Sequence, residues 1–182
     1  MSQKHYVQQG VFHITTNTKN KVPWLTLDSI PALLIDNLVM SRNIHGAKVF
    51  AFCILPDHMH IILEPGQSGL SALMHSFKRN VMRDTRKLLP EAEVRNFRVS
   101  PEENLECCGR YGSSASVNDV PMIRWQKSFH DERIRDSRQR STVIGYVQYN
   151  AVHHRLVKDI TDWPWTSLHC PDVLDPMEVW IT

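Results

Sequence analysis

The sequence carries one local pattern with clear chemical potential, the run LPDHMH at residues 55–60, which continues as an apolar segment to Glu64. On a β-strand alternate side chains point to one face, so His58 and His60 project together while Met59 points to the other face. Two imidazoles on one face can supply neutral nitrogen ligands to a single divalent metal ion. The pair alone also fits two ordinary surface histidines, so a third ligand is needed to favour a metal site.

A second pattern supplies candidates for that ligand and for a nucleophile. Tyr146 and Asn150 stand four residues apart in a segment with helical character, so they share one helix face, bordered by Val143 and His153. An asparagine carbonyl is a hard oxygen ligand, and a phenol oxygen beside a metal can act as a nucleophile. The alternative is that Tyr146 and Tyr149 are half-buried core aromatics. Spacing cannot show that this helix and the histidine strand converge.

The elements that must position these residues follow from periodicity and turn signals. Alternating or continuous apolar runs predict strands at residues 10–18, 48–55, 59–63 and 123–129. Apolar residues at helical spacing predict helices at 28–44, 68–89 and 141–157, the last begun by Ser141 and Thr142 as caps. Trp163 and Trp165 should pack on the core. Residues 90–120 fit neither pattern and resemble an inserted loop, expected to be partly disordered or functionally specialised.

Composition favours one soluble globular domain spanning residues 1–182, with 42% hydrophobic and 22% charged residues. Disordered and collagen-like classes are excluded. The sequence has no run approaching the ~20 apolar residues of a membrane-spanning helix and no apolar signal-peptide run after its polar start. The four cysteines lack CxxC spacing, which favours reduced thiols over a disulfide framework. We therefore expect a cytoplasmic protein without a membrane partner.

The net charge of +2 conceals a polarised distribution. Residues 76–87 carry a net charge of +4 and residues 124–140 carry +3, whereas residues 91–106 carry −3. Two basic patches indicate a polyanionic partner, although a solvated helix face is the alternative for either patch alone. The residues predicted to bind nucleic acid are Lys78, Arg79, Arg83, Arg86, Lys87, Arg124, Lys127, Arg133 and Arg135. Trp125 could stack on a base or belong to the core.

Taken in order, three motifs carry a resemblance to a known family. Leu-Pro-x-His-x-His is followed by Tyr146-x-x-x-Asn150-Ala-Val, with Leu-Val at 156–157, and then by DWPWTS at 162–167. This order resembles the single-tyrosine HUH transposases, and within them the REP-associated tyrosine transposases, relatives of the insertion-sequence 200/605 enzymes. The similarity runs from about His5 to His169. Ala151 replaces the family's usual proline and Arg155 its usual glycine, and the 90–120 segment is longer than the usual connection.

The resemblance implies a fold and a chemistry. The fold would be α+β, a ferredoxin-like (RRM-like) antiparallel sheet with helices packed on one face, which is the HUH nuclease architecture. His58 and His60 would lie on a central strand and Tyr146 on a facing helix. His58, His60 and Asn150 would hold Mg²⁺ or Mn²⁺, and Tyr146 would attack single-stranded DNA to form a 5′-phosphotyrosine. No nucleotide cofactor is implied.

The resemblance also implies a partner and leaves two other functions open. Relatives recognise hairpin or REP-type palindromic DNA, and we expect a monomer, with a dimer left open, located at the nucleoid when bound to DNA. One alternative is a domesticated, non-catalytic hairpin DNA- or RNA-binding protein that keeps the constellation of residues. The other is a hydrolytic metallophosphoesterase, which would need further acidic or histidine ligands and would form no covalent intermediate.

Overall fold

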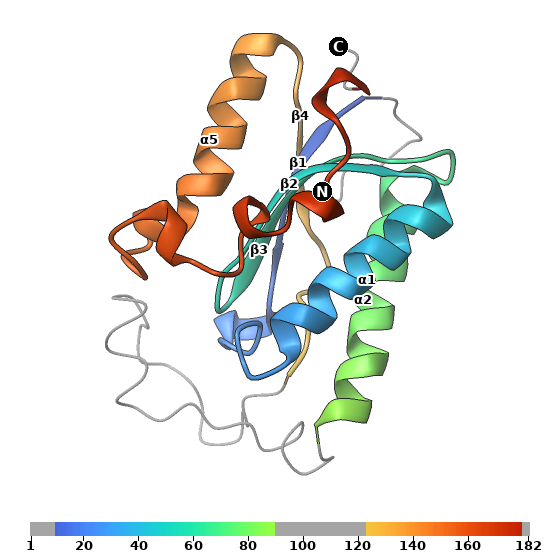
Figure 1. The fold of residues 1–182 in the computed structure, drawn as a ribbon. Helices are drawn as coiled ribbons and strands as arrows, with labels where there is room; N and C mark the ends of the chain where they lie inside the picture. Colours follow the sequence, from blue (N-terminus) through green and yellow to red (C-terminus); the bar gives the residue numbers. More distant parts are fainter. Residues whose placement is uncertain (1–9, 90–122, 180–182) are drawn as a thin grey trace.

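The computed structural model describes residues 10–89 and 123–179 and contains one four-stranded antiparallel sheet (Figure 1). Its strands are β1 (Phe12–Asn17), β2 (Lys48–Ile54), β3 (His58–Glu64) and β4 (His130–Arg133), in the spatial order β2-β3-β1-β4. The helices are α1 (Ile30–His45), α2 (Gly69–Leu88) and α5 (Ser137–His153). The α+β class with an antiparallel sheet is therefore confirmed, with β3 in a central position.

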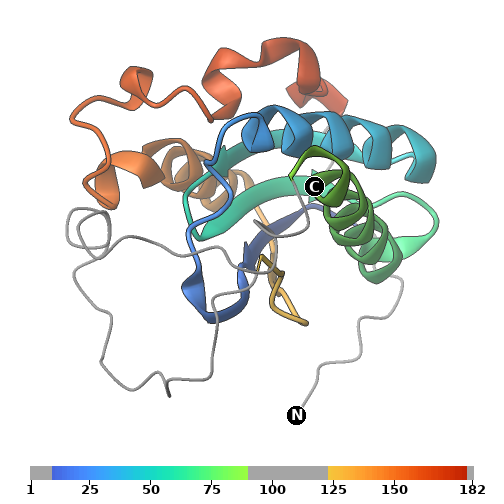
Figure 2. The same cartoon turned by 90° about the horizontal axis from the view of Figure 1, so that it is seen from below.

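The two faces of β3 have different neighbours. Met59, Ile61 and Leu63 belong to the larger core, which α1 and α2 help to form on one side of the sheet (Figure 2). Ile62 belongs to a second core that includes Val147 of α5. The expected helical layer on one face therefore consists of α1 and α2, whereas α5 packs on the opposite face. Because His58 and His60 alternate with the larger core's residues, they point to the α5 side.

The fourth strand lies further along the chain than the sequence pattern predicted. Residues 123–129 contribute only an isolated bridge between Trp125 and Thr18, and the strand itself is β4, with the sequence HDER. β4 pairs with β1 at the sheet edge, where Arg133 lies opposite Phe12 and His130 opposite Thr15. The prediction of a strand at 123–129 is therefore wrong. The sequence pattern missed β4 because an edge strand with one open face needs no alternation of apolar residues.

The third helix also begins earlier than predicted. The side chain of Asp136 caps α5 by accepting a hydrogen bond from the backbone N–H of Gln139 at 2.8 Å. Ser141 and Thr142, the predicted caps, instead donate their hydroxyl hydrogens to backbone carbonyls four residues earlier within the helix. The first turn was missed because its exposed sequence SRQR shows no apolar periodicity.

Helix α5 ends in a Schellman motif, before the predicted boundary at residue 157. The Leu156 N–H donates to the Ala151 carbonyl at 3.0 Å and the Arg155 N–H to the Val152 carbonyl at 2.8 Å. Arg155 adopts a φ of 60°, in the left-handed region that favours glycine. The position where the related family has glycine is thus the position that reverses the chain after the helix.

The tryptophans of the 162–167 segment pack on the core as expected. The Trp163 indole N–H donates to the Ile54 carbonyl at 2.8 Å, and the Ile54 N–H donates to the Trp165 carbonyl at 2.9 Å. The predicted 90–120 insert lies outside the described residues. Among the helices of the described ranges, none combines the length and hydrophobicity needed to cross a membrane.

Candidate active site

His58 and His60 lie side by side on the α5 face of β3, as their spacing predicted. Both side chains are buried, and their ring centroids are 5.0 Å apart. The turn between β2 and β3 places Asp57 directly before the first histidine, and the Leu55 N–H donates to the His58 carbonyl across that turn at 2.9 Å. A tight hairpin therefore presents both imidazoles at one end of a central strand.

The His58 ring is oriented by its neighbour. Its Nδ1 donates to Asp57 Oδ1 at 2.5 Å, and Asp57 Oδ2 forms an ion pair with Lys21 Nζ at 3.3 Å. Burial alone would raise the pKa of the Asp57 carboxyl, but the hydrogen bond from His58 and the charge of Lys21 lower it below its usual value. The ionised carboxylate thus fixes Nδ1 as the protonated nitrogen and directs Nε2 of His58 toward other partners.

The His60 ring is fixed in a similar way. Its Nδ1 lies 3.0 Å from Nε2 of His13 and 3.1 Å from the hydroxyl of Thr15, while its own Nε2 is buried and has no hydrogen-bond partner within the described residues. Burial, followed by the charges of His58 and His13, lowers the pKa of His60 to about 2. The imidazole is therefore neutral at physiological pH, which is the form that coordinates metal ions.

His13 is a site residue that the sequence analysis did not assign. It lies on β1 opposite Ile62 of β3, and its ring stacks on the His60 ring with centroids 5.1 Å apart. Burial lowers its pKa. The alternation of His13 and Thr15 on one strand was a usable signal, but only the antiparallel register places both of them against His60.

Helix α5 brings Tyr146 against the strand histidines. The ring of Tyr146 stands edge-on to those of His60 and His13, with centroids 5.4 and 5.8 Å away. Tyr146 is 45% exposed, so its phenol faces both the histidines and solvent. One turn further on, Asn150 is completely buried. Val147 and Ala151, both buried, hold this face of α5 against the sheet.

The polar atoms around this point lack partners in a way that suits a divalent cation. Both amide atoms of Asn150 and Nε2 of His60 are buried without hydrogen bonds among the described residues. Such orphaned groups cost roughly 1–3 kcal/mol each unless a ligand satisfies them. No group of three His, Cys, Asp or Glu side chains in the described ranges is arranged to hold a metal. By their chemistry the imidazoles of His58 and His60 and the Asn150 amide oxygen would suit such a cation, with coordination positions left open for substrate.

Two further histidines border the site from the end of α5. The ring of His154 lies 5.0 Å from that of His58, and the ring of His153 lies 6.5 Å from that of Tyr146. Burial and the neighbouring His58 lower the pKa of His154. The sequence analysis placed His153 at the border of this face but did not assign His154, because it continued the helix to residue 157, whereas α5 ends at His153.

The predicted basic residues of α2 divide into two groups. Lys78 donates to the carbonyls of Gln126 and Ser128 at 3.0 and 2.8 Å and lies over the rings of Trp125 and Phe129. Burial lowers its pKa to about 8, and its two hydrogen bonds anchor the loop at residues 126–128 to α2.

The remaining α2 cations are exposed. Arg83 and Lys87 pair with Asp84, while Arg79, Arg83 and Arg86 line an open pocket of about 440 Å³. Arg79, Arg83 and Arg86 therefore form an open, positively charged surface on α2.

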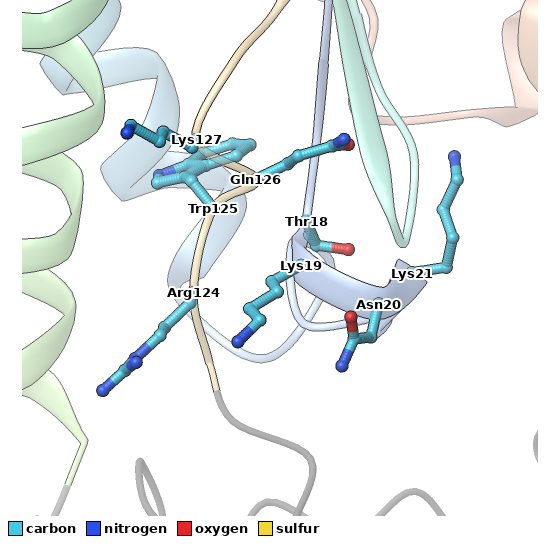
Figure 3. A pocket seen from close by; sticks show the side chains of 8 residues that line it. All are labelled: Thr18, Lys19, Asn20, Lys21, Arg124, Trp125, Gln126 and Lys127. Atoms are coloured by element: carbon cyan, nitrogen blue, oxygen red, sulfur yellow. The ribbon is translucent and has the colours of Figure 1, made fainter. Parts of the chain in front are cut away.

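The second basic patch is split between the two ends of β1. Arg133 lies opposite Phe12 and is followed by the exposed Arg135, whereas Arg124 and Lys127 lie at the other end, beside the turn after Asn17. There they line a pocket of about 640 Å³ together with Lys19 and Lys21 (Figure 3).

Trp125 belongs mainly to the core. Its ring lies edge-on to that of Trp24, with centroids 5.1 Å apart, and 6.2 Å from that of Phe77. The core interpretation of this tryptophan is therefore the better one.

Comparison with known proteins gives a consistent result. Residues 6–100 match the family model described as "Transposase IS200 like". A Haemophilus influenzae protein described as a candidate REP-associated tyrosine transposase is 29% identical over 67% of this chain, and the match spans 59% of that protein. The REP-associated tyrosine transposase of Escherichia coli is 21% identical over 92% of this chain and 81% of its own length.

The fold is shared with a solved structure. It is that of a REP-associated tyrosine transposase bound to a REP hairpin, with a TM-score of 0.67 at 20% identity, covering 100% of this chain and 91% of the other.

Proposed function

This chain belongs to the IS200-like transposase family, and on that premise we propose that it is a metal-dependent single-stranded DNA endonuclease and strand transferase that acts on hairpin or REP-type palindromic DNA. The observation that carries the proposal is the contact of the Tyr146 ring with the His60 ring, with the buried and unpartnered Asn150 amide one helical turn further along α5. Tyr146 is the nucleophile, and His58, His60 and Asn150 hold a divalent cation. The family match and the hairpin-bound structural neighbour support DNA as the substrate.

The position of Tyr146 suits attack on a phosphodiester. Its phenol oxygen bonds to phosphorus, the bond from phosphorus to the 3′ oxygen breaks, and the departing oxygen takes a proton to become a 3′-hydroxyl. The product is a 5′-phosphotyrosine, and attack by another 3′-hydroxyl reverses the step and joins strands. Phosphate bond energy is conserved throughout, so no nucleotide cofactor is consumed.

The protein residues around the tyrosine prepare the site before substrate arrives. Nδ1 of His58 is hydrogen-bonded to Asp57, and Nδ1 of His60 lies within hydrogen-bond distance of His13 and Thr15. Nε2 of each ring would therefore be the nitrogen that holds the cation. A bound Mg²⁺ or Mn²⁺ supplies positive charge that polarises the scissile phosphate and favours the phenolate. The imidazole pair favours Mn²⁺ on grounds of ligand softness, whereas oxygen donors suit Mg²⁺.

The proposed DNA interface consists of the exposed α2 cations Arg79, Arg83, Arg86 and Lys87, with Arg124, Lys127, Arg133 and Arg135 around β1 and β4. These side chains can contact backbone phosphates without reading sequence. Lys78 supports the interface indirectly by anchoring residues 126–128. We propose that a monomer, one domain spanning this chain, carries out the reaction.

The proposal is tested with labelled hairpin oligonucleotides that carry single-stranded flanks. In Mn²⁺ or Mg²⁺ the protein should release a fragment that a polymerase can extend, which reports a free 3′-hydroxyl. EDTA should abolish the release. Tight, salt-sensitive binding with no cleavage of any flank sequence would instead favour a domesticated hairpin-binding protein. Release of a fragment bearing a free 5′-phosphate, without a protein adduct, would favour a hydrolytic metallophosphoesterase.

A further inference from the structure

We propose that the pocket between the turn at residues 18–21 and the segment at residues 124–127 binds a backbone phosphate and the adjoining base of the single-stranded DNA flank, close to the bond that is cleaved. The inference rests on the proposed function and adds a site to it. The pocket has a volume of about 640 Å³, within the range of small-ligand sites.

The pocket concentrates positive charge. Lys19, Lys21, Arg124 and Lys127 are among its lining residues, and none of the described residues that line it carries a carboxylate. Within residues 10–89 and 123–179, Lys19, Arg124 and Lys127 form no ion pair with a carboxylate, whereas Lys21 pairs with Asp57. Among the described residues, Lys19 and Arg124 are therefore cations that one anion could contact together (Figure 3), and a nucleic-acid phosphate is the anion that suits this chemistry and the nearby site.

Backbone contacts between two distant segments build the pocket. The Lys19 N–H donates to the Arg124 carbonyl at 2.7 Å, and the Gln126 N–H donates to the Asn17 carbonyl at 2.8 Å. Figure 3 shows Lys19 and Asn20 from the turn and Arg124 from the facing segment directed to the same side. The pairing thus brings two cations and an amide, which can bind the edge of an unstacked base, into one opening.

The turn itself has an unusual conformation. Asn20 and Lys21 have φ values of 56° and 58°, so two successive residues with side chains occupy the left-handed region. This conformation lets Lys21 donate to Asn17 Oδ1 at 2.8 Å and pair with Asp57 while Lys19 stays exposed. Unfavourable backbone geometry of this kind is retained where it positions functional side chains.

The pocket connects directly to the active site. Lys21 Nζ contacts Asp57 Oδ2 at 3.3 Å, and Asp57 Oδ1 contacts His58 Nδ1 at 2.5 Å, so one wall lies two contacts from a proposed metal ligand. Asn17, the last residue of β1, pairs with His58 in the sheet register. A strand whose scissile phosphate lies at Tyr146 and His58 can therefore place a nearby phosphate in the pocket.

The test measures binding of the hairpin oligonucleotide in the Tyr146→Phe background, so that cleavage does not interfere. Lys19→Gln and Arg124→Gln should each weaken binding about tenfold at low salt. Each should also reduce the slope of log affinity against log salt by about 0.7, the value for one single-strand phosphate contact. Lys158→Gln, which removes an exposed lysine outside the pocket, is the matched control and should change neither quantity.

Single methylphosphonate substitutions, walked along the oligonucleotide, locate the phosphate. At one position in the single-stranded flank, the methylphosphonate should weaken binding to the Tyr146→Phe protein. The same methylphosphonate should cause no further loss of affinity when the protein also carries Lys19→Gln. Additive losses at every position, or non-additivity only within the stem, would overturn the assignment. Formation of a covalent DNA adduct is measured separately with the protein that keeps Tyr146. If no adduct forms, the proposed function is contradicted. If the adduct forms but Lys19→Gln and Arg124→Gln leave the salt slope unchanged, only the pocket inference is contradicted.

Discussion

The ring of Tyr146 on α5 stands edge-on to the ring of His60 on β3, with 5.4 Å between their centroids, although the two residues belong to distant parts of the chain. Packing of α5 against β2 and β3 creates this relationship, because Val147 and Ala151 bury the helix face next to the tyrosine. A phenol and a neutral imidazole thereby meet at one partly solvent-exposed point.

Asn150→Ala should separate metal binding from folding. The substitution removes two buried amide atoms that lack partners, so the metal-free protein should be as stable as the parent or more stable, by up to about 1–3 kcal/mol. The increase in melting temperature that Mn²⁺ produces in the parent should be lost. Thermal unfolding in EDTA and in Mn²⁺ measures both effects. A variant that is still stabilised by Mn²⁺ to the parental extent would exclude Asn150 as a ligand.

Asp57→Asn should weaken metal binding through His58. The carboxylate accepts the Nδ1 hydrogen of His58, and loss of such a contact typically lowers metal affinity by about 10–100-fold. Calorimetric titration with Mn²⁺ provides the affinity. Asp84→Asn, which alters a partly exposed carboxylate on α2 paired with Arg83 and Lys87, is the matched control. Equal Mn²⁺ affinities for the two variants would show that Asp57 does not position the ligand.

Arg155→Gly should stabilise the fold. Arg155 has a φ of 60°, a conformation that costs a residue with a side chain about 1–2 kcal/mol. The greater entropy of glycine in the unfolded chain offsets part of this gain, so we expect an increase in the free energy of unfolding of roughly 0.5–1 kcal/mol. Urea denaturation measures it. A decrease would indicate that the arginine side chain makes a compensating contact.

Acidification should destabilise the metal-free protein well before carboxylates titrate. Burial lowers the pKa of His13, His60 and His154 in the folded state, to about 2 for His60, whereas unfolded histidines titrate near ~6.5. The unfolded state therefore binds more protons below that pH, and stability present above it is lost as the pH falls. The urea midpoint in EDTA should drop steadily between pH 7.5 and pH 5. A constant or rising midpoint would contradict this account.

The expected loss of stability between pH 7.5 and pH 5 can be assigned to the histidines. The pKa of Asp57 is lowered in the folded state, so its contribution is lost only as the pH falls below the ordinary aspartate range. His60→Asn, compared with the parent in the same buffers, should flatten the decline between pH 7.5 and pH 5. An unchanged decline would place its origin elsewhere.

The sequence was informative where periodicity and burial agree. The alternation in HMHIIL predicted both the strand and the face shared by His58 and His60, because Met59, Ile61 and Leu63 had to enter the core. The four-residue spacing of Tyr146 and Asn150 placed them on one helix face for the same reason. Their convergence on the histidines depended on tertiary packing, which only the resemblance to a known family could anticipate.

The failures have a common cause, which is the absence of an apolar signal. β4 is a short polar edge strand, and the first turn of α5 is exposed, so neither produces the periodicity that marks an element. The contact between His13 and His60 depends on the β1–β3 register. The charge of Lys78 gave no sign that its amine lies over two aromatic rings and donates to loop carbonyls, and its contact with DNA stays a prediction.

The most direct measurement is detection of the covalent protein–DNA adduct. The parental protein, incubated with a hairpin oligonucleotide labelled on the 3′ side of the cleaved bond and with Mn²⁺, should yield a labelled band that survives denaturing electrophoresis. Mass spectrometry should locate the nucleotide on Tyr146. Tyr149→Phe removes a phenol from the same helix, 56% exposed, and should keep the adduct, whereas Tyr146→Phe should eliminate it. An adduct retained by Tyr146→Phe would contradict the central claim.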